Sequence, residues 1–249
     1  MTSPATQDEL DAALAGGTLK GLHLAPPLSW PQLEFSDAIE DCTFEAMDLS
    51  HREFPGASFR ACTFFGCQLR GAVLRGASFE RCQFFDSDTE ASADLQFADL
   101  TEAQFTNCDL SMANLARTKV RGVELTGCQA QGTDFSDADF SLSAVDVASA
   151  TFRRCNLAYA DFSGTKLTGC ELSECRLVHS LWHDADLGEA DLQGSSFENI
   201  EGRGLILGGA DLRGATINNL DPRDVDLDGV RMNLDQGIVI LRTLGIEMD

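Results

Sequence analysis

Small and large apolar residues recur along most of the chain with a period of five residues. In residues 93–105, a small residue is followed two positions later by Leu or Phe, as in Ala93 with Leu95 and Ala98 with Leu100. A five-residue step rotates a helix by about 500°, and it reverses the face of an unbroken strand at every repeat. The period therefore indicates short extended sides that are separated by corners.

Each pentad is predicted to form one side of a square coil. The small and the large residue are two apart, so they point the same way into the interior, while the other three residues face solvent. Four sides close a coil of about 20 residues, and successive coils stack at about 4.8 Å. The sequence thus predicts an all-β fold, a quadrilateral β-helix.

The phase of the large positions shifts twice, which predicts two insertions. One phase runs from Ile39 to Phe84, the next from Leu95 to Phe140, and the third begins at Phe152. We expect a polar, acidic loop over residues 85–92 and a second loop over residues 141–149, each projecting from a corner. The valines of the second stretch leave an irregular coil side as an alternative.

Both ends of the chain depart from the period. Residues 1–36 are expected to form a cap with a short helix over residues 8–15, ended by two glycines, although a partner-binding tail is the alternative. The repeat array is expected to span residues 37–232. Asn233 and Gln236 have capping-box spacing, which predicts a C-terminal helix that ends at Gly245, within a dimerisation segment over residues 233–249.

The C-terminal helix carries apolar residues on more than one face. One face can close the last coil, and the surplus needs a second partner, for which a homodimer is the economical answer. The residues expected in this dimer interface are Ile238, Ile240, Leu241, Leu244 and Ile246.

The charge of the chain is strongly acidic. A net charge of −22 and a pI near 4.3 exclude direct nucleic-acid binding, which needs basic patches to neutralise phosphate. Many of the aspartates stand immediately before the large residue of a pentad, where we expect them to face solvent. Such acid can serve solubility alone or provide an electrostatic field for a basic partner.

The nine cysteines all stand at the small inward position, where alanine is the usual occupant. Packing as small apolar side chains explains them, so no metal and no cofactor are expected, and free thiols indicate a reducing, cytoplasmic location. No stretch approaches the ~20 apolar residues of a membrane span. No catalytic motif is present, His179 and His183 are expected to be ordinary surface residues, and Trp182 is expected in the core, so an enzyme is not expected.

The period resembles that of the pentapeptide-repeat proteins, whose motif is Ala-(Asp/Asn)-Leu-x-x. The segments that match the motif are 113–115, 160–162, 185–187, 190–192 and 210–212. Longer strings resemble the Qnr-type quinolone-resistance proteins within this family. These strings are Cys82–Asp86, Cys108–Ala113, Cys128–Gly132, Ala158–Phe162, Cys170–Leu172 and Leu244–Ile246.

The Qnr resemblance implies a right-handed β-helix that dimerises through its C-terminal helix. It implies binding to a bacterial type II topoisomerase, DNA gyrase or topoisomerase IV, by mimicry of DNA, with protection from quinolones or other gyrase poisons. The loop residues expected to bind the topoisomerase are Asp86, Asp88, Glu90, Leu142, Val145 and Asp146, and the acidic DNA-mimicking face is expected to include Asp161, Asp186, Asp191 and Asp211. A scaffold for an unrelated protein partner is the alternative function.

Overall fold

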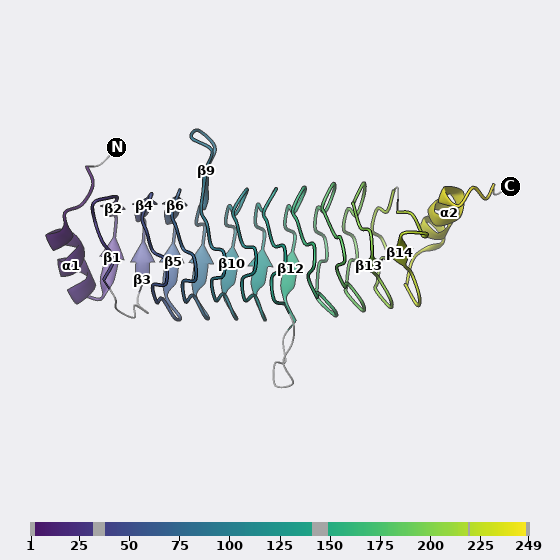
Figure 1. The fold of residues 1–249 in the computed structure, drawn as a ribbon, viewed down its shortest axis with the longest axis horizontal. Helices are drawn as coiled ribbons and strands as arrows, with labels where there is room; N and C mark the ends of the chain where they lie inside the picture. Colours follow the sequence, from purple (N-terminus) through teal and green to yellow (C-terminus); the bar gives the residue numbers. More distant parts are fainter. Residues whose placement is uncertain (1–2, 32–37, 141–148, 219, 248–249) are drawn as a thin grey trace.

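The chain forms an elongated rod of stacked coils with one helix at each end (Figure 1). The computed structural model describes residues 3–31, 38–140, 149–218 and 220–247. Helix α1 (Gln7–Ala15) lies at the N-terminal end and α2 (Leu234–Thr243) at the C-terminal end. The solenoid has about 10 turns. The predicted quadrilateral β-helix with two short terminal helices is confirmed.

Four rows of parallel pairing run along the rod, and we number them sides 1 to 4 in chain order. Side 1 begins with a seven-stranded sheet of β1 (Thr18–Lys20), β3 (Ala38–Glu40), β5 (Ser58–Arg60), β7 (Ser78–Glu80), β10 (Gln104–Thr106), β11 (Glu124–Thr126) and β12 (Thr151–Arg153). It continues as isolated bridges through Asp191 and Asp211. Side 2 begins with β2 (His23–Leu24), β4 (Thr43–Glu45) and β6 (Thr63–Phe65). Side 3 consists of isolated bridges such as Asp94 with Asn114. Side 4 consists of bridges such as Asp99 with Lys119, followed by β13 (Leu205–Ile206) and β14 (Val225–Asp226).

Aromatic ladders fill the interior at the spacing of the coils. On side 1, the rings of Phe59 and Phe79 stack with centroids 4.8 Å apart, and Phe105 continues the ladder at 4.6 Å. On side 3, Trp182 stacks on Phe162 at 4.4 Å and is buried, which confirms its place in the core. Stacked pairs contribute about 0.5–1.5 kcal/mol each beyond their burial, so the aromatic sides hold the coils in register.

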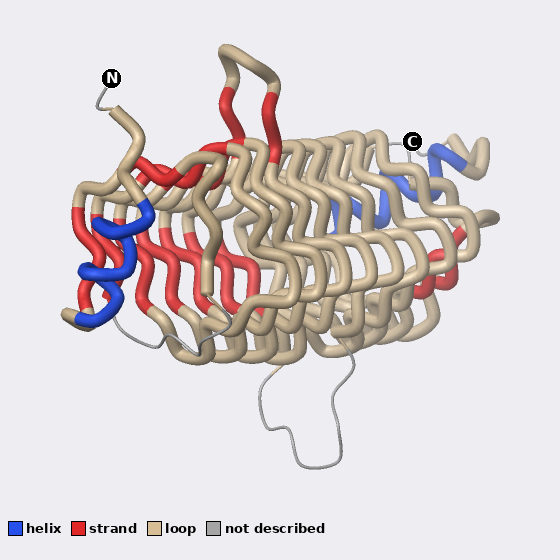
Figure 2. The backbone as a smooth tube through the Cα atoms, turned by 60° about the vertical axis from the view of Figure 1, so that its left-hand side comes forward, coloured by secondary structure: helices blue, strands red, loops and turns tan. Residues whose placement is uncertain are grey.

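Both phase shifts correspond to residues inserted between paired coils. Paired residues in successive coils are normally 20 residues apart in sequence, as Ser58 and Ser78 are. This separation rises to 26 between Ser78 and Gln104 and to 27 between Glu124 and Thr151. The first insertion forms an antiparallel hairpin of β8 (Phe85–Asp86) and β9 (Ala91–Ser92), which projects from the rod between sides 2 and 3 (Figures 1 and 2). The second leaves between sides 4 and 1, and its residues 141–148 lie outside the described part of the chain.

The first coil begins earlier than the period indicates, so residues 1–36 are not only a cap. β1 pairs in parallel with β3 and β2 pairs with β4, which places Leu19 beside Ile39 and Leu24 beside Phe44 in the inward ladders. The small inward slot before Leu24 holds Leu22 instead of Ala or Cys, which hides the repeat. The predicted helix is confirmed, and a capping box between Thr6 and Glu9 starts it.

Seven of the cysteines occupy one slot in successive coils of side 2, namely Cys42, Cys62, Cys82, Cys108, Cys128, Cys155 and Cys175. From Cys62 onward, each thiol donates to the carbonyl of the large side 1 residue one coil earlier; Cys108 Sγ lies 3.3 Å from the Phe79 oxygen. Where Ser195 replaces Cys, the corner instead closes with a bond from the Ser195 N–H to the Leu192 carbonyl. Packing alone is therefore an incomplete explanation of the cysteines, because the thiol also satisfies a buried carbonyl.

Burial makes these thiols poor nucleophiles. All nine cysteines are free and buried, and loss of hydration raises the pKa of the Cys67 thiol and of the Cys170 thiol to about 12. These two thiols therefore stay protonated at neutral pH, which suits the hydrogen bond that Cys67 donates to the Phe44 carbonyl.

We expect Cys108→Ala to lower the free energy of unfolding by about 0.5–1.5 kcal/mol, because the Phe79 carbonyl loses its thiol donor. Cys108→Leu should cost about 1–3 kcal/mol through overpacking of the same slot. Urea titration measures both values. A Cys108→Ala variant as stable as the parent would contradict a role for the thiol–carbonyl bond.

Candidate protein-binding surface

The aspartates before the large residues cap the corners. The side chain of Asp161 accepts a hydrogen bond from the Ser163 N–H at 2.8 Å, and Asp186 accepts one from the Gly188 N–H at 2.9 Å. Asp94, Asp109, Asp134 and Asp191 make the same contact. Because short carboxylates can bond to a backbone N–H two residues on, these residues stabilise the turns. Most of them are half-buried, so the prediction that they simply face solvent is wrong.

The four aspartates expected on one acidic face lie on different sides. Asp161 belongs to side 3, Asp186 to side 4, and Asp191 and Asp211 to side 1. Consecutive pentads occupy consecutive sides, so the sequence pattern alone does not place such residues on a common face.

Asp211 is buried, which corrects its assignment to an exposed surface. Its side chain is 4% exposed, and the Arg213 guanidinium donates to it at 2.7 Å, with Arg231 3.6 Å away. The bonds from Arg213 lower the pKa of this carboxyl group below its usual value. Asp211 is therefore a structural ion-pair centre in the last coils.

Exposed acidic residues also lie at the corners, where sequence reasoning did not place them. Glu102 and Glu189 lie between sides 4 and 1, and Asp137 and Asp184 between sides 3 and 4. All four have positive φ, from 54° to 59°. Each of them stands two residues after the large residue of its pentad. The chain turns at this position and the side chain points away from the core, so the position could have predicted their exposure.

The hairpin adds acidic residues at the corner between sides 2 and 3. Its tip is held by Asp86, which accepts hydrogen bonds from the Asp88 N–H at 3.0 Å and from the Thr89 hydroxyl at 2.6 Å. These contacts lower the pKa of the Asp86 carboxyl group, Thr89 being the largest contributor. Asp88 and Glu90 are exposed, so the hairpin presents two free carboxylates away from the rod. The other expected loop residues, Leu142, Val145 and Asp146, lie outside the described residues.

The C-terminal helix exposes only part of the expected dimer surface. Ile240 is 9% exposed and packs with the core of its own chain, so its assignment to a dimer interface is wrong. Gln236 donates to the Leu212 and Ala215 carbonyls, which orients the helix so that Ile240 faces the last coil. Ile238 and Leu241 are half-buried. Leu234, at 82%, Leu244 and Ile246 are exposed at the end of the rod.

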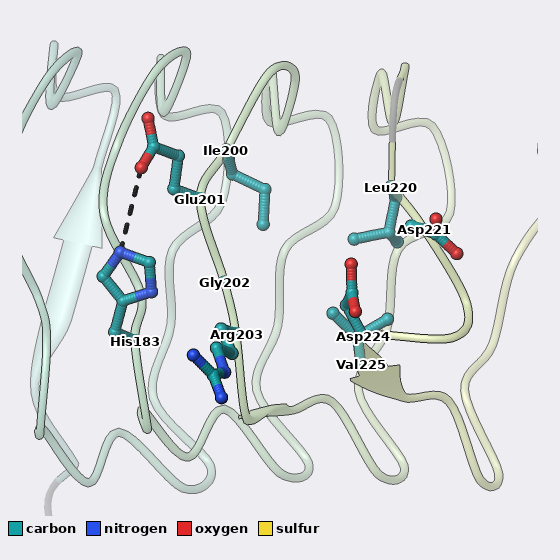
Figure 3. A pocket seen from close by; sticks show the side chains of 9 residues that line it. All are labelled: His183, Ile200, Glu201, Gly202, Arg203, Leu220, Asp221, Asp224 and Val225. Carbon is teal, nitrogen blue, oxygen red and sulfur yellow. Dashed lines mark ion pairs between the residues drawn. The ribbon is translucent and has the colours of Figure 1, made fainter.

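A cleft opens where the repeat weakens near the C-terminal end (Figure 3). Gly202 and Pro222 occupy successive large positions of side 3, and the resulting space has a volume of about 260 Å³. His183 Nε2 lies 3.8 Å from Glu201 Oε2 at its edge, and Asp221 and Asp224 line the opposite wall. His183 pairs with Glu201, and Asp221 pairs with Arg223 at 2.6 Å. The lining residues do not place a nucleophile beside a base, so this cleft is a hollow in the surface.

Within residues 3–31, 38–140, 149–218 and 220–247, no cluster of three or more His, Cys, Asp or Glu side chains could hold a metal ion. Neither helix of this part of the chain has the length and apolar character that crossing a membrane requires.

Two family models match the chain. The model described as "Pentapeptide repeat region" matches residues 77–162, and the model described as "Pentapeptide repeats (8 copies)" matches residues 42–81, 148–181 and 183–219. Together they cover most of the solenoid.

Several proteins with Qnr names are similar to this chain. The chain is 34% identical over 99 residues to the quinolone resistance pentapeptide repeat protein QnrB96 of Scandinavium goeteborgense, and 38% identical over 55 residues to the pentapeptide repeat protein QnrB4 of Escherichia coli. These alignments cover 40% and 22% of this chain, and 35% and 26% of the relatives' own lengths. The full-length structure of QnrB1, a plasmid-mediated fluoroquinolone resistance protein, superposes with a TM-score of 0.77 at 32% identity, over 84% of this chain and 100% of that one.

We expect Asp211→Asn to lower the free energy of unfolding at neutral pH, because it removes the charge that pairs with Arg213 and Arg231. A carboxyl group with a lowered folded-state pKa stabilises the fold above its unfolded value of about 3.9, and this stabilisation disappears as the pH falls through the folded pKa. The difference between parent and variant should therefore shrink below about pH 4, as measured by urea titration at several pH values. A difference that stays constant from neutral to acidic pH would contradict this role.

Proposed function

The chain belongs to the pentapeptide-repeat family as a Qnr-like member, and we propose that it binds the bacterial type II topoisomerases, DNA gyrase or topoisomerase IV, and protects them from quinolones. The Qnr-named relatives support a quinolone-resistance function of the repeat protein. The observation that carries the finer proposal is an acidic rod with exposed carboxylates on its corners. Nine free, buried thiols are compatible with the reducing cytoplasm, where these enzymes act.

The electrostatics of the rod suit a partner that grips DNA. A net charge of −22 on an elongated surface attracts a basic groove and speeds encounter with it. At about 4.8 Å per coil, the coils span roughly 45–50 Å, and a tail-to-tail dimer would be about twice as long. This is the scale of a DNA segment that crosses a topoisomerase. We propose that Glu102, Asp137, Asp184 and Glu189 supply the exposed charge.

The hairpin and the C-terminal helix complete the proposal. We assign Asp88 and Glu90, at the exposed tip of the hairpin, to specific contacts with the topoisomerase, together with the second insertion between sides 4 and 1. We assign Leu234, Leu244 and Ile246 to the homodimer contact, because these apolar side chains are exposed at the end of the rod. A scaffold for an unrelated protein remains the second candidate, since acid can also serve solubility alone.

Equilibrium binding to purified gyrase and topoisomerase IV tests the proposed function. We expect affinity to fall with rising salt, and linear duplex DNA to compete with the protein. The fourfold variant Glu102→Gln, Asp137→Asn, Asp184→Asn, Glu189→Gln should bind more weakly, mainly through a slower association, because separated surface charges steer encounter. The matched control Asp161→Asn, Asp186→Asn changes half-buried corner caps and should affect association less. Absence of binding to both enzymes at every salt concentration would favour the scaffold.

We expect replacement of residues 86–91 by a two-glycine link to leave the coils folded, because the hairpin pairs mainly with itself. Protection of gyrase from quinolone should be reduced. Circular dichroism measures the fold, and a gyrase cleavage assay measures the protection. Protection equal to that of the parent protein would remove the hairpin from the binding surface.

We expect Leu234→Asp with Leu244→Asp to convert a dimer into a folded monomer, because unpaired charge in such an interface is costly. Ile206→Asp is the matched control, since Ile206 is similarly exposed on side 4, away from the helix. Sedimentation at micromolar concentration gives the oligomeric state. A parent protein that is already monomeric there would show that the assignment is wrong.

A further inference from the structure

One corner of this acidic rod carries no acid beyond the hairpin. Among the described residues at the corner between sides 2 and 3, those that follow the hairpin are Met112, Gly132, Tyr159, His179 and Asn199. We call Met112, Gly132, Tyr159 and His179 the corner strip. With a spacing of about 4.8 Å per coil, it extends roughly 15 Å along the rod.

The corner strip exposes large side chains that the fold does not need. Met112 is 56% exposed and Tyr159 is 59% exposed, although both have positive φ, 57° and 61°. A left-handed conformation costs a residue with a Cβ roughly 1–2 kcal/mol, and glycine fills many other corners of this chain. Since these side chains recover little of that cost by burial, a role outside the fold accounts for them better than stability does.

The side chains of the strip pack in two pairs along the rod. The Met112 thioether lies over Gly132, where an added Cβ would come within 2.6 Å of the sulfur atom. The Tyr159 ring then stacks on the His179 ring with centroids 5.1 Å apart and planes inclined by 11°. Gly132 thus leaves room for Met112, and the stack holds Tyr159 in place.

Side 2, next to the strip, has few charged residues over these coils. Its outward residues include Ser111, Gln129, Gln131 and Thr216, and its charged residues are Asp109, Arg176 and Glu198. Each of these three is hydrogen-bonded to a neutral group: the Asp109 carboxylate accepts from the Ser111 N–H at 2.9 Å, Arg176 donates to Asn156, and Glu198 accepts from Asn218 at 2.6 Å. A low proportion of charged residues around Met and Tyr is typical of the centre of a protein–protein interface.

The hairpin stands at one end of the strip. The Phe84 N–H, just before β8, bonds to the Asp109 carbonyl at 2.7 Å, so the coil with the hairpin directly precedes the coil of Met112. The hairpin projects from this same corner (Figures 1 and 2). The hairpin and the strip thus share one corner of the rod in adjacent coils, so a single partner can contact both.

We infer that the corner strip is an anchor for an uncharged, apolar-centred segment of the topoisomerase, adjacent to the basic surface that the acidic corners recognise. This inference rests on the proposed function. The two surfaces act on different steps: the acidic corners speed association, whereas the strip, which contains no Asp, Glu, Lys or Arg, slows dissociation. A second copy of the chain is the other occupant that the test must distinguish.

Association and dissociation rates on immobilised gyrase, at several salt concentrations, test this assignment. For Met112→Ala with Tyr159→Ala, we expect dissociation to be about 10-fold faster or more, with association and its salt dependence unchanged. Phe97→Ala is the matched control, because Phe97 is an exposed aromatic residue at the next corner with positive φ. It packs near the Arg70 guanidinium, 5.8 Å from its ring centroid, and its loss should change dissociation by less than about twofold.

The outcomes separate the two proposals. If the parent protein binds and the double variant dissociates at the same rate, the anchor is wrong and the proposed function stands. If the parent protein binds neither topoisomerase, both proposals fail. If the double variant binds gyrase normally but loses self-association in sedimentation, the strip is a contact between copies of the chain. Unchanged thermal melting of both variants shows that the fold is intact.

Discussion

Backbone hydrogen bonds between successive coils are the constraint on which the structure depends. Each side donates to the coil before it and to the coil after it, as when the Asp94 N–H bonds to the Cys67 carbonyl and the Leu95 N–H to the Asn114 carbonyl. A coil therefore cannot shift by one residue without reversing its inward and outward side chains. Extra residues can leave only at corners, as the hairpin of β8 and β9 does between sides 2 and 3. Backbone groups near the corners need further hydrogen-bond partners. Aspartate carboxylates accept from the N–H groups there, and cysteine thiols donate to the carbonyl groups.

The period of the sequence was sufficient to predict the fold, and its phase shifts located both insertions. Asn233 and Gln236 likewise predicted the start of α2, where the structure shows the capping box. The sides on which particular residues lie were harder to predict, because each step of five moves to the next side. The four aspartates that the sequence grouped as one face consequently lie on three sides.

Two errors have one physical origin, because packing against neighbouring coils decides whether a side chain is exposed. Asp211 is buried because Arg213 and Arg231 surround it, and Ile240 is buried because Gln236 fixes the helix against the last coil. The first coil was missed because its slot before Leu24 holds Leu22 in place of a small residue. The exposed acidic residues and the corner strip were missed for another reason. They stand at a position of the repeat where the residue type varies, and its conformation is seen only in the structure.

We propose that three parts of the surface have different roles: the acidic corners speed encounter with the partner, the hairpin makes specific contacts, and the corner strip slows dissociation. Quinolone-stabilised DNA cleavage by purified gyrase, titrated with this protein, tests the central claim most directly. We expect cleaved DNA to decrease as the protein is added, and supercoiling to be inhibited at higher protein concentration. Cleavage that stays constant up to saturating protein would contradict the account.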